Sequence, residues 1–424
     1  MDVAVIGGGY VGLVYAGGLA HLGHRVRVGE VNAARVETLR QGKVPIYEQG
    51  LNGLIARGVE HELLTFHTSN PEAVAGAGFV FLTLPTPPAA DGRADTSFVD
   101  AVIDEIGPLL DEGAIIVVKS TVPVGTATRL RKRLADIGSR AISVSNPEFL
   151  REGKAVEDFL KPDRIVIGAF DPADGLRLAS LYAGLEAPFV HTDPTSAEMI
   201  KYAANSYLAT RLTFANTLSN LCEAVGADVR DVIKGIGYDF RIGPHFLNPG
   251  PGYGGSCFPK DTVALIATAE ESGYDFQLLK AVIRADEEQR WRVVEKVRRA
   301  VGGDLRKKTV ALWGLAFKAG TDDVRESPAV RIADLLKAAG AKVVAYDPEA
   351  SLEWLTLASS PVEAARGADV VLLATDWPEF IRVDLRQVAS VMRGRRLIDA
   401  RNLLDPPLVR AAGLEYEGLG RPTA

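Results

Sequence analysis

Short apolar runs alternate with helix-length segments over the first 192 residues and again after about residue 308. In the first stretch, six runs predict strands: Val3–Ile6, Arg25–Val31, Phe79–Leu84, Ala114–Ser120, Ala141–Ser145 and Arg164–Gly168. In the second stretch, four runs predict strands: Thr309–Trp313, Lys342–Tyr346, Val370–Ala374 and Arg396–Asp399. Nearly continuous apolar strands separated by helices are typical of parallel sheets with both faces covered. The pattern therefore predicts an α/β fold with two doubly wound parallel sheets.

The residues between these two patterns read as helical. Ser196–Val225 has helical spacing with neither proline nor glycine; Pro194 interrupts the pattern before it, and Gly226 ends it. Further helical segments extend to about Arg299, and the Val-Gly-Gly-Asp stretch at 301–304 is typical of a linker. We therefore expect Rossmann-like domains over residues 1–192 and 301–424, joined by a helical domain over residues 193–300 that contains one long helix.

Composition excludes several classes of protein. Of the 424 residues, 47% are hydrophobic and 24% charged, which is typical of folded domains rather than disordered chains or coiled coils. The two cysteines cannot form a disulfide framework, no run of about 20 apolar residues occurs, and the first residues lack the basic start of a signal peptide. A net charge of −6 gives no general attraction to nucleic acid or membrane. We expect a soluble, cytoplasmic protein that binds neither.

A glycine-rich turn follows the first predicted strand. Gly7, Gly9 and Gly12 satisfy the G-x-G-x-x-G pattern and open a helical segment, where small residues and helix amides can approach a pyrophosphate. The second predicted strand carries Glu30 near its end, where a carboxylate can bind both ribose hydroxyls and repel a 2′-phosphate. These features favour NAD over NADP. The alternative is an ordinary glycine turn beside a solvated glutamate.

A second glycine-rich loop carries a cysteine. Cys257 lies in the run from Pro249 to Asp261, and the helical pattern after Pro259 predicts that a helix begins there. A thiolate at a helix N-terminus is stabilised by exposed amides, and Asp261 lies one helical turn further on, where it can handle a proton. Cysteine is more often a small buried apolar residue. That description fits Cys222, in an apolar helical pattern, better than it fits Cys257.

Eight motifs occur in a fixed order along the chain: GGGYVG at 7–12, PIYEQGL at 45–51, TLPTPP at 83–88, KSTVPVGT at 119–126, SNPEFLREG at 145–153, EMIKYAAN at 198–205, GPGYGGSCFPKD at 250–261 and GLAFKAGTDDVRESP at 314–328. On these motifs the chain resembles the UDP-glucose/GDP-mannose dehydrogenase family over essentially its full length. The resemblance implies that the C6 alcohol of a sugar nucleotide, UDP-glucose foremost, is oxidised to a carboxylate with two NAD⁺ and one water. A cysteine thiohemiacetal and a thioester are the implied intermediates.

The resemblance assigns Cys257 as the nucleophile. Lys201 and Asn205, four residues apart on one helical face, match the pair that stabilises developing oxyanions and positions the sugar. Asp261 matches the acid associated with this lysine and with a catalytic water. Without the matched motifs, Lys201 reads equally well as a surface lysine and Asn205 as a polar helix residue.

Two further catalytic positions are implied by the resemblance. Glu148, in the NPEF turn, matches the general base for thioester hydrolysis, and Thr121 matches a hydroxyl that orients water and cofactor. Both residue types also commonly cap the ends of helices.

The resemblance also implies binding residues. Those for NAD are Gly7, Gly9, Tyr10, Val11, Gly12, Glu30, Pro85, Thr86, Thr121, Glu152, Lys260 and Arg325. Those for the sugar nucleotide are Glu148, Phe149, Leu150, Lys201, Asn205, Arg241, Phe246, Tyr253, Gly254, Phe317, Lys318 and Arg401. Of these, Arg241 would be donated to a neighbouring subunit's site, with the 196–225 helix as the core of a homodimer. The apolar face of that helix equally permits packing within one chain.

Three departures from the family pattern leave every catalytic group in place: Glu30 stands where aspartate is usual, Gln49 replaces a proline, and Ala319 replaces another. The sugar nucleotide stays open, since TDP-glucose, GDP-mannose or a UDP-N-acetylhexosamine would undergo the same chemistry. A catalytically silent NAD-binding regulator is disfavoured because a binding protein needs no nucleophilic cysteine. A metal-dependent dehydrogenase is disfavoured because the six histidines form no H-x-x-x-H pair and the two cysteines lie far apart.

Overall fold

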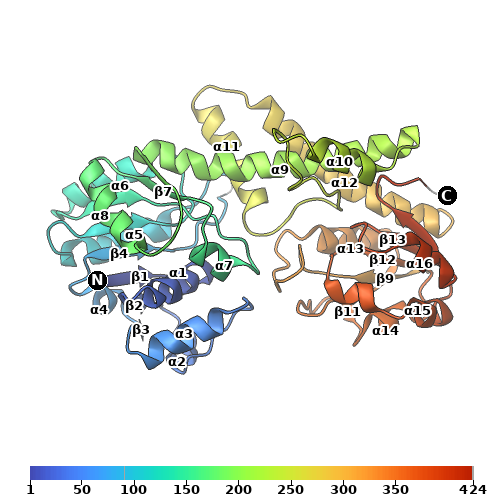
Figure 1. The fold of residues 1–424 in the computed structure, drawn as a ribbon, viewed down its shortest axis with the longest axis horizontal. Coiled ribbons are helices and arrows are strands. Elements are labelled where there is room, and N and C mark those ends of the chain that lie inside the picture. The colour runs from blue at the N-terminus through green and yellow to red at the C-terminus, as the bar shows by residue number, and fades with distance from the viewer. Residues whose placement is uncertain (90, 423–424) are drawn as a thin grey trace. The chain divides into compact units, whose positions relative to one another are not determined.

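A computed structural model describes residues 1–89 and 91–422. The chain divides into two compact units: Met1–Ala204 with Val263–Gly273, and Asn205–Thr262 with Tyr274–Ala424. Two helices contribute residues to both units, namely α9 (Pro194–Val225) and α11 (Phe258–Glu271). Figure 1 shows a sheet with helices on both faces in each unit.

The first unit is built on an eight-stranded sheet in the order β3-β2-β1-β4-β5-β6-β7-β8. Every neighbouring pair is parallel except β6 and β7, which pair antiparallel through Ser145 and Gly168. The strand order reverses between β1 and β4, and ligands of open α/β sheets bind outside the carboxyl ends of the strands at such a point. The strands are β1 (Asp2–Ile6), β2 (Arg25–Gly29), β3 (Leu64–His67), β4 (Phe79–Leu82), β5 (Ile115–Val118), β6 (Ile142–Ser145), β7 (Ile165–Gly168) and β8 (Phe189–Thr192).

Both faces of this sheet bury apolar side chains. One core includes residues of α1 and α3, and the other includes residues of α4, α5 and α6. All four residues of β4 and of β5 are buried, as strands covered on both faces require. The helices are α1 (Tyr10–His21), α2 (Ala33–Arg40), α3 (Leu51–Glu60), α4 (Asn70–Val74), α5 (Ser97–Ile106), α6 (Thr126–Asp136), α7 (Ala155–Leu160) and α8 (Pro172–Ala179), with the short helix η2 (Ser180–Tyr182) after α8.

The second unit contains a six-stranded, wholly parallel sheet in the order β11-β10-β9-β12-β13-β14. Its core surrounds Trp313, which is fully buried and donates its indole N–H to the Pro361 carbonyl at 3.1 Å. The strands are β9 (Thr309–Trp313), β10 (Lys342–Tyr346), β11 (Thr356–Leu357), β12 (Val370–Leu373), β13 (Arg396–Asp399) and β14 (Glu415–Gly418). The helices are α10 (Val229–Gly237), α12 (Gln277–Ala300), α13 (Pro328–Ala338), α14 (Pro361–Ala365), α15 (Leu385–Val391) and α16 (Pro406–Ala411).

All ten predicted strands are present, and the predicted fold class is confirmed. Four strands that the apolar pattern missed are β3, β8, β11 and β14, which are the outer strands of the two sheets. These strands are partly exposed, so they lack the continuous apolar runs that mark central strands.

The long helix was predicted to begin at Ser196, but α9 begins at Pro194, because proline is tolerated in a first helical turn. It ends at Val225 before Gly226, which has a φ of 78°. Among the described residues, no helix is long and apolar enough to cross a membrane.

Candidate active site

The glycine turn between β1 and α1 depends on glycine in two ways. Gly7 has a φ of 105°, and a Cβ on Gly12 would lie 1.9 Å from the Gly7 carbonyl oxygen. By contrast, a Cβ on Gly9, the N-cap of α1, would meet nothing within 4 Å. The turn therefore packs tightly on its inner side and leaves open space at the helix N-terminus, as a pyrophosphate requires.

Glu30 lies directly after β2, with its carboxylate against the glycine turn. A Cβ on Gly8 would come within 2.9 Å of Glu30 Oε2. The other carboxylate oxygen accepts the Asn32 N–H at 2.8 Å, and the Arg35 guanidinium lies 3.4 Å from Oε2. Strand β2 ends at Gly29 rather than at the predicted Val31, so Glu30 is a loop residue at the carboxyl edge of the sheet. This is the position of a ribose-binding acid in an NAD site.

Glu48 is a buried residue of this region that was not predicted from the sequence, although it lies in the PIYEQGL motif. Its carboxylate accepts the hydroxyl of Tyr10, which begins α1, and the amides of Gly153 at 2.6 Å and Ala155 at 2.9 Å. It therefore ties the glycine turn, with Tyr10 and Val11, to the loop that contains Glu152. In the sequence, Glu48 is a single acidic residue between two turn-forming segments.

The loops after β4 and β5 are joined by side-chain hydrogen bonds. Thr86 is buried and donates its hydroxyl to the Thr121 carbonyl at 2.8 Å, while the neighbouring Pro85 is exposed. Ser120 donates to the Leu84 carbonyl at 2.7 Å. Thr121 is half-buried at the carboxyl edge of the sheet, where the predicted cofactor-binding residues of this unit also lie.

Glu148 and Lys201 form a buried ion pair of 2.8 Å, although 53 residues separate them in the sequence. Glu148 also accepts the Leu150 N–H at 2.6 Å. Burial alone would raise the pKa of Glu148, but the Lys201 ammonium and the Leu150 amide outweigh it and lower that pKa below its usual value. Phe149 stands between Glu148 and Leu150 in the motif. Its ring centroid lies 3.6 Å from Cζ of the Arg164 guanidinium and 5.5 Å from Lys201 Nζ.

Cys257 lies in the second unit, directly before the first residue of α11, so it occupies the N-cap position of that helix. Its carbonyl accepts the Asp261 N–H at 2.8 Å, and its half-buried Sγ lies 3.6 Å from the Ser256 hydroxyl. The glycines before it allow close packing, since a Cβ on Gly254 would lie 2.4 Å from the Glu326 carbonyl and one on Gly255 would lie 2.8 Å from the Phe317 ring.

The second cysteine has different surroundings. Cys222 is 3% exposed within an apolar cluster that includes Val229, Ile233 and Leu247. Burial raises the pKa of its thiol. Cys222 is thus a core residue, whereas Cys257 is partly exposed at a helix terminus where a thiolate is favoured.

Asp261, in the first turn of α11, is fully buried. It accepts the side-chain amide of Asn205 at 2.6 Å and the ammonium of Lys260 at 2.6 Å. Lys201 and Asn205 lie one turn apart on α9, so the helix presents a cation paired with Glu148 and an amide paired with Asp261.

A polar network that was not predicted from the sequence holds the backbone of the cysteine loop. Asp286 Oδ1 accepts the Tyr253 N–H at 2.8 Å, and Arg290 donates to Asp286 Oδ2 at 2.6 Å. Gln289 donates to the Gly250 carbonyl at 3.0 Å, and Asn216 accepts the Gly250 N–H at 2.8 Å. Burial raises the pKa of Asp286 to about 6 despite Arg290. Each of these residues is a polar position within a helical pattern, and none belongs to a recognisable motif.

The predicted substrate residues of the β9–β13 region lie around one loop. Arg401 donates to the Phe317 carbonyl at 2.9 Å and to the Ala374 carbonyl at 2.8 Å, while Lys318 Nζ lies 5.4 Å from the Phe317 ring centroid. The loop before Phe317 is fixed by Asp347, which accepts the amides of residues 315 and 316. Of the aromatic residues in the cysteine loop region, Phe246 has a φ of 57°, and Tyr253 contacts the Phe258 ring edge-on.

Two predicted arginines lie on the surface of the chain. The Arg241 side chain is 76% exposed and pairs with Asp239, and the Arg325 side chain is 65% exposed and pairs with Asp323. The loop that carries Arg241 is attached to α9, because Arg211 donates to the Gly243 carbonyl at 3.0 Å.

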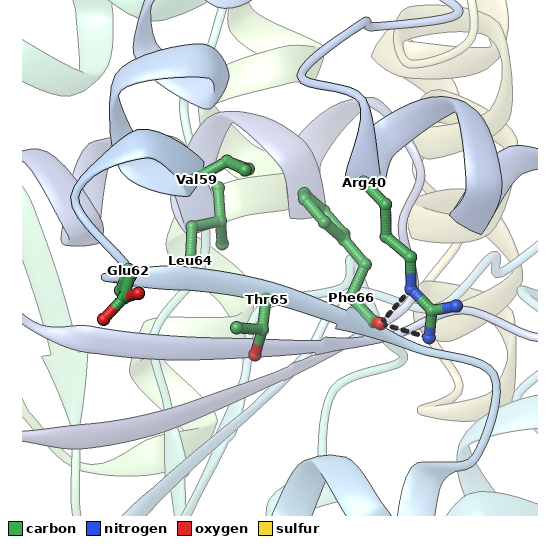
Figure 2. Close-up of a pocket in the computed structure, with 6 residues that line it drawn as sticks. All are labelled: Arg40, Val59, Glu62, Leu64, Thr65 and Phe66. Atoms are coloured by element: carbon green, nitrogen blue, oxygen red, sulfur yellow. Dashed lines mark hydrogen bonds between the residues drawn. The ribbon is translucent and has the colours of Figure 1, made fainter.

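Figure 2 shows a pocket beside the edge strand β3, where Arg40 donates two hydrogen bonds to the Phe66 carbonyl. None of the predicted site residues lines this pocket. Its lining residues are Arg40, Val59, Glu62, Leu64, Thr65 and Phe66.

The glycine turn with its neighbouring acid defines an NAD-binding dehydrogenase fold, and the cysteine at a helix N-cap adds a candidate nucleophile to it. Models of the UDP-glucose/GDP-mannose dehydrogenase family match three segments: the NAD binding domain at residues 1–186, the central domain at 195–288 and the UDP binding domain at 311–406. The chain belongs to this family. It is an NAD-dependent oxidoreductase, as predicted.

Relatives of known name match along their whole length. The chain is 42% identical to UDP-glucose 6-dehydrogenase of Pseudomonas aeruginosa, covering 100% of this chain and 98% of that one, and 42% identical to that of Rhizobium meliloti, covering 100% of both. A solved structure of a UDP-glucose dehydrogenase from Pyrobaculum islandicum is 40% identical, with a TM-score of 0.91 over 99% of this chain and 97% of that one. A UDP-D-ManNAc dehydrogenase from Pyrococcus horikoshii is 26% identical, with a TM-score of 0.91 over 100% of both chains.

Proposed function

We propose that the protein oxidises the C6 alcohol of UDP-glucose to the carboxylate of UDP-glucuronate, with two NAD⁺ and one water per turnover. The observation that carries this proposal is Cys257 at the N-cap of α11, since a simple alcohol dehydrogenase needs no thiol. The two 42% identical relatives, both UDP-glucose 6-dehydrogenases, support the choice of sugar nucleotide.

The first half of the reaction produces an aldehyde. The glycine turn and Glu30 would hold NAD⁺, which would supply the hydride acceptor for each of the two oxidations at C6. In the first, the C6 hydroxyl would pass its proton to the water associated with Asp261 while the hydride leaves, and Lys201 and Asn205 stabilise the charge that develops on the oxygen. Their fixed partners Glu148 and Asp261 support this role, because a held donor needs little reorganisation when charge develops.

The second half needs the thiol. The Cys257 thiolate adds to the aldehyde carbon to form a thiohemiacetal, and the second hydride transfer leaves a thioester. Water then attacks the thioester carbonyl, the bond from carbon to sulfur breaks with its electron pair on sulfur, and Glu148 takes the water proton. Thr121 would orient this water and the nicotinamide. The lowered pKa of Glu148 supports the role, because a base must be ionised before the proton moves.

We also propose that the three family segments act as an NAD-binding domain over residues 1–192, a central domain over 193–300 and a sugar-nucleotide domain over 301–424. In the last of these, Phe317, Lys318 and Arg401 would contact the nucleotide sugar. The loop position fixed by Arg401 and Asp347 supports this assignment.

A homodimer through α9 is the proposed quaternary state. Tyr207, Phe214 and Leu221 recur every seven residues on α9 and are 61%, 56% and 57% exposed. Such a stripe faces one side of a helix and is apolar enough to be covered by a partner. The nearby loop with Phe240, which is 93% exposed, and Arg241 would then reach the partner subunit's substrate. Light scattering should give twice the chain mass for the protein and a monomer for Phe214→Glu.

The second candidate is the same oxidation of a UDP-N-acetylhexosamine. The structural match to a UDP-D-ManNAc dehydrogenase favours it, although the identity is only 26%. A panel of UDP-glucose, TDP-glucose, GDP-mannose and UDP-N-acetylhexosamines, each assayed for NADH formation, separates the candidates. We expect kcat/KM for UDP-glucose to exceed the others by at least about tenfold. A higher value for an acetylated sugar would replace the proposed substrate.

A further inference from the structure

Lys119 is a lysine inside the core of the first unit. It follows β5 directly, is 1% exposed, and is among the largest fully buried side chains of the described chain. Its Nζ donates to Asn146 Oδ1 at 2.8 Å and approaches the Pro147 carbonyl at 3.4 Å, and it lies 4.1 Å from the Tyr15 ring centroid. Burying an ammonium group costs free energy, so a buried lysine is rare and suggests a functional role.

The partner of Lys119 is fully buried and uses its whole side chain. Asn146 Oδ1 accepts both Lys119 and the Tyr182 hydroxyl, and its Nδ2 donates to the Val166 carbonyl at 2.6 Å. These bonds join the ends of β5 and β6 to β7 and to the short helix η2. Asn146 and Pro147 come directly before Glu148, so the cluster fixes the turn that carries this carboxylate.

The same lysine also acts on Glu148 by charge. Burial raises the pKa of Glu148. Lys201 is the main influence that lowers this pKa, and Lys119 lowers it further. Burial holds the pKa of Lys119 itself well below its usual value, against the attraction of Glu148. Tyr15 and Arg164 also interact electrostatically with Glu148.

We propose that Lys119, acting through Asn146 with Tyr182, is a positioning residue that holds the Glu148 turn for hydrolysis of the thioester. The inference rests on the proposed function, since it assumes that Glu148 takes the proton of the attacking water. Lys119 reaches the reaction through this turn and does not itself touch the reacting atoms. A general base works only within hydrogen-bond reach of its proton, so a small displacement of the turn slows hydrolysis more than the hydride transfers, in which Glu148 acts only as the partner of Lys201.

The test is rapid-mixing measurement of NADH formation by Lys119→Met, which keeps the length of the side chain and removes the amine. We expect a burst of up to two NADH per active site, slowed much less than the steady state that follows, which should be slowed by roughly tenfold or more. Intact-mass spectrometry should then find the thioester on the enzyme. A burst slowed as much as the steady state, or wild-type turnover, would overturn the proposal.

Two further variants keep the test decisive. Tyr182→Phe removes only one hydroxyl of the cluster and should show the same retained burst with a smaller slowing, which decides the question if Lys119→Met does not fold. Lys132→Met, an exposed lysine on α6, is the matched control and should behave as wild type.

Glu148→Gln separates this inference from the proposed function. If Glu148→Gln accumulates no thioester, the assigned base is wrong and the proposed mechanism fails. If it accumulates thioester whereas Lys119→Met and Tyr182→Phe do not, only the positioning role of Lys119 fails.

Discussion

Lys201 donates a hydrogen bond of 2.8 Å to Glu148, and less than a tenth of either side chain is exposed. The pair joins α9 to the turn after β6. Removing one partner of a buried ion pair leaves an uncompensated charge, which is more destabilising than removing both partners.

We therefore expect Lys201→Met to lower the free energy of unfolding by about 3–5 kcal/mol. The double variant Lys201→Met with Glu148→Leu should recover much of that loss, although it should be inactive. Urea unfolding of the four proteins forms a double-mutant cycle. If the losses in free energy of unfolding of the two single variants simply add in the double variant, the two side chains do not interact.

Cys257 and Cys222 provide a matched pair of substitutions. Cys257→Ser should abolish overall turnover with little change in thermal stability, because the residue is half-buried at a helix start. Cys222→Ala should retain turnover and lose about 1 kcal/mol of stability through the cavity it leaves. Initial rates and melting curves measure both quantities. Full turnover of Cys257→Ser would require another nucleophile.

The glycine turn allows a test that separates an effect on folding from an effect on NAD binding. Gly9→Ala places its Cβ in open space on an extended backbone, so folding should be unchanged while NAD binding weakens by roughly tenfold or more. Gly12→Ala forces a Cβ against the Gly7 carbonyl and should destabilise the unit itself. Calorimetric titration with NAD⁺ and melting temperature report the two effects. Unchanged NAD affinity in Gly9→Ala would place the pyrophosphate elsewhere.

Asp286 makes stability depend on pH in a defined direction. Its pKa rises from 3.8 to about 6 on folding, so between these values the folded chain holds a proton that the unfolded chain has lost. The contribution of this group to stability is therefore greatest below pH 4 and is lost as the pH rises through 6. Compared with Asp286→Asn, the wild type should be relatively more stable at pH 5 than at pH 7. The reverse order in urea unfolding would show that Arg290 depresses the pKa instead.

The central strands were predictable and the edge strands were not, for a physical reason. Val370–Ala374 is apolar throughout because β12 is covered on both faces, whereas none of the four residues of β8 is fully buried. Sequence periodicity reports burial, and only central strands are buried on both sides.

The site shows the same division. The glycine turn and the cysteine loop were predictable because local backbone geometry demands glycine and a helix start. The pairing of Glu148 with Lys201 was not, since the partners are 53 residues apart and only the tertiary fold joins them. Glu48 and Asp286 were missed because each acts on backbone amides of a distant loop, and such contacts leave no local pattern.

The proposed reaction is a four-electron oxidation in which Cys257 holds the intermediate. It is tested most directly by counting NADH and identifying the product when a limiting amount of UDP-glucose is consumed completely. We expect two NADH per UDP-glucose and a glucuronate product with no free aldehyde. One NADH per UDP-glucose with release of the 6-aldehyde would contradict it.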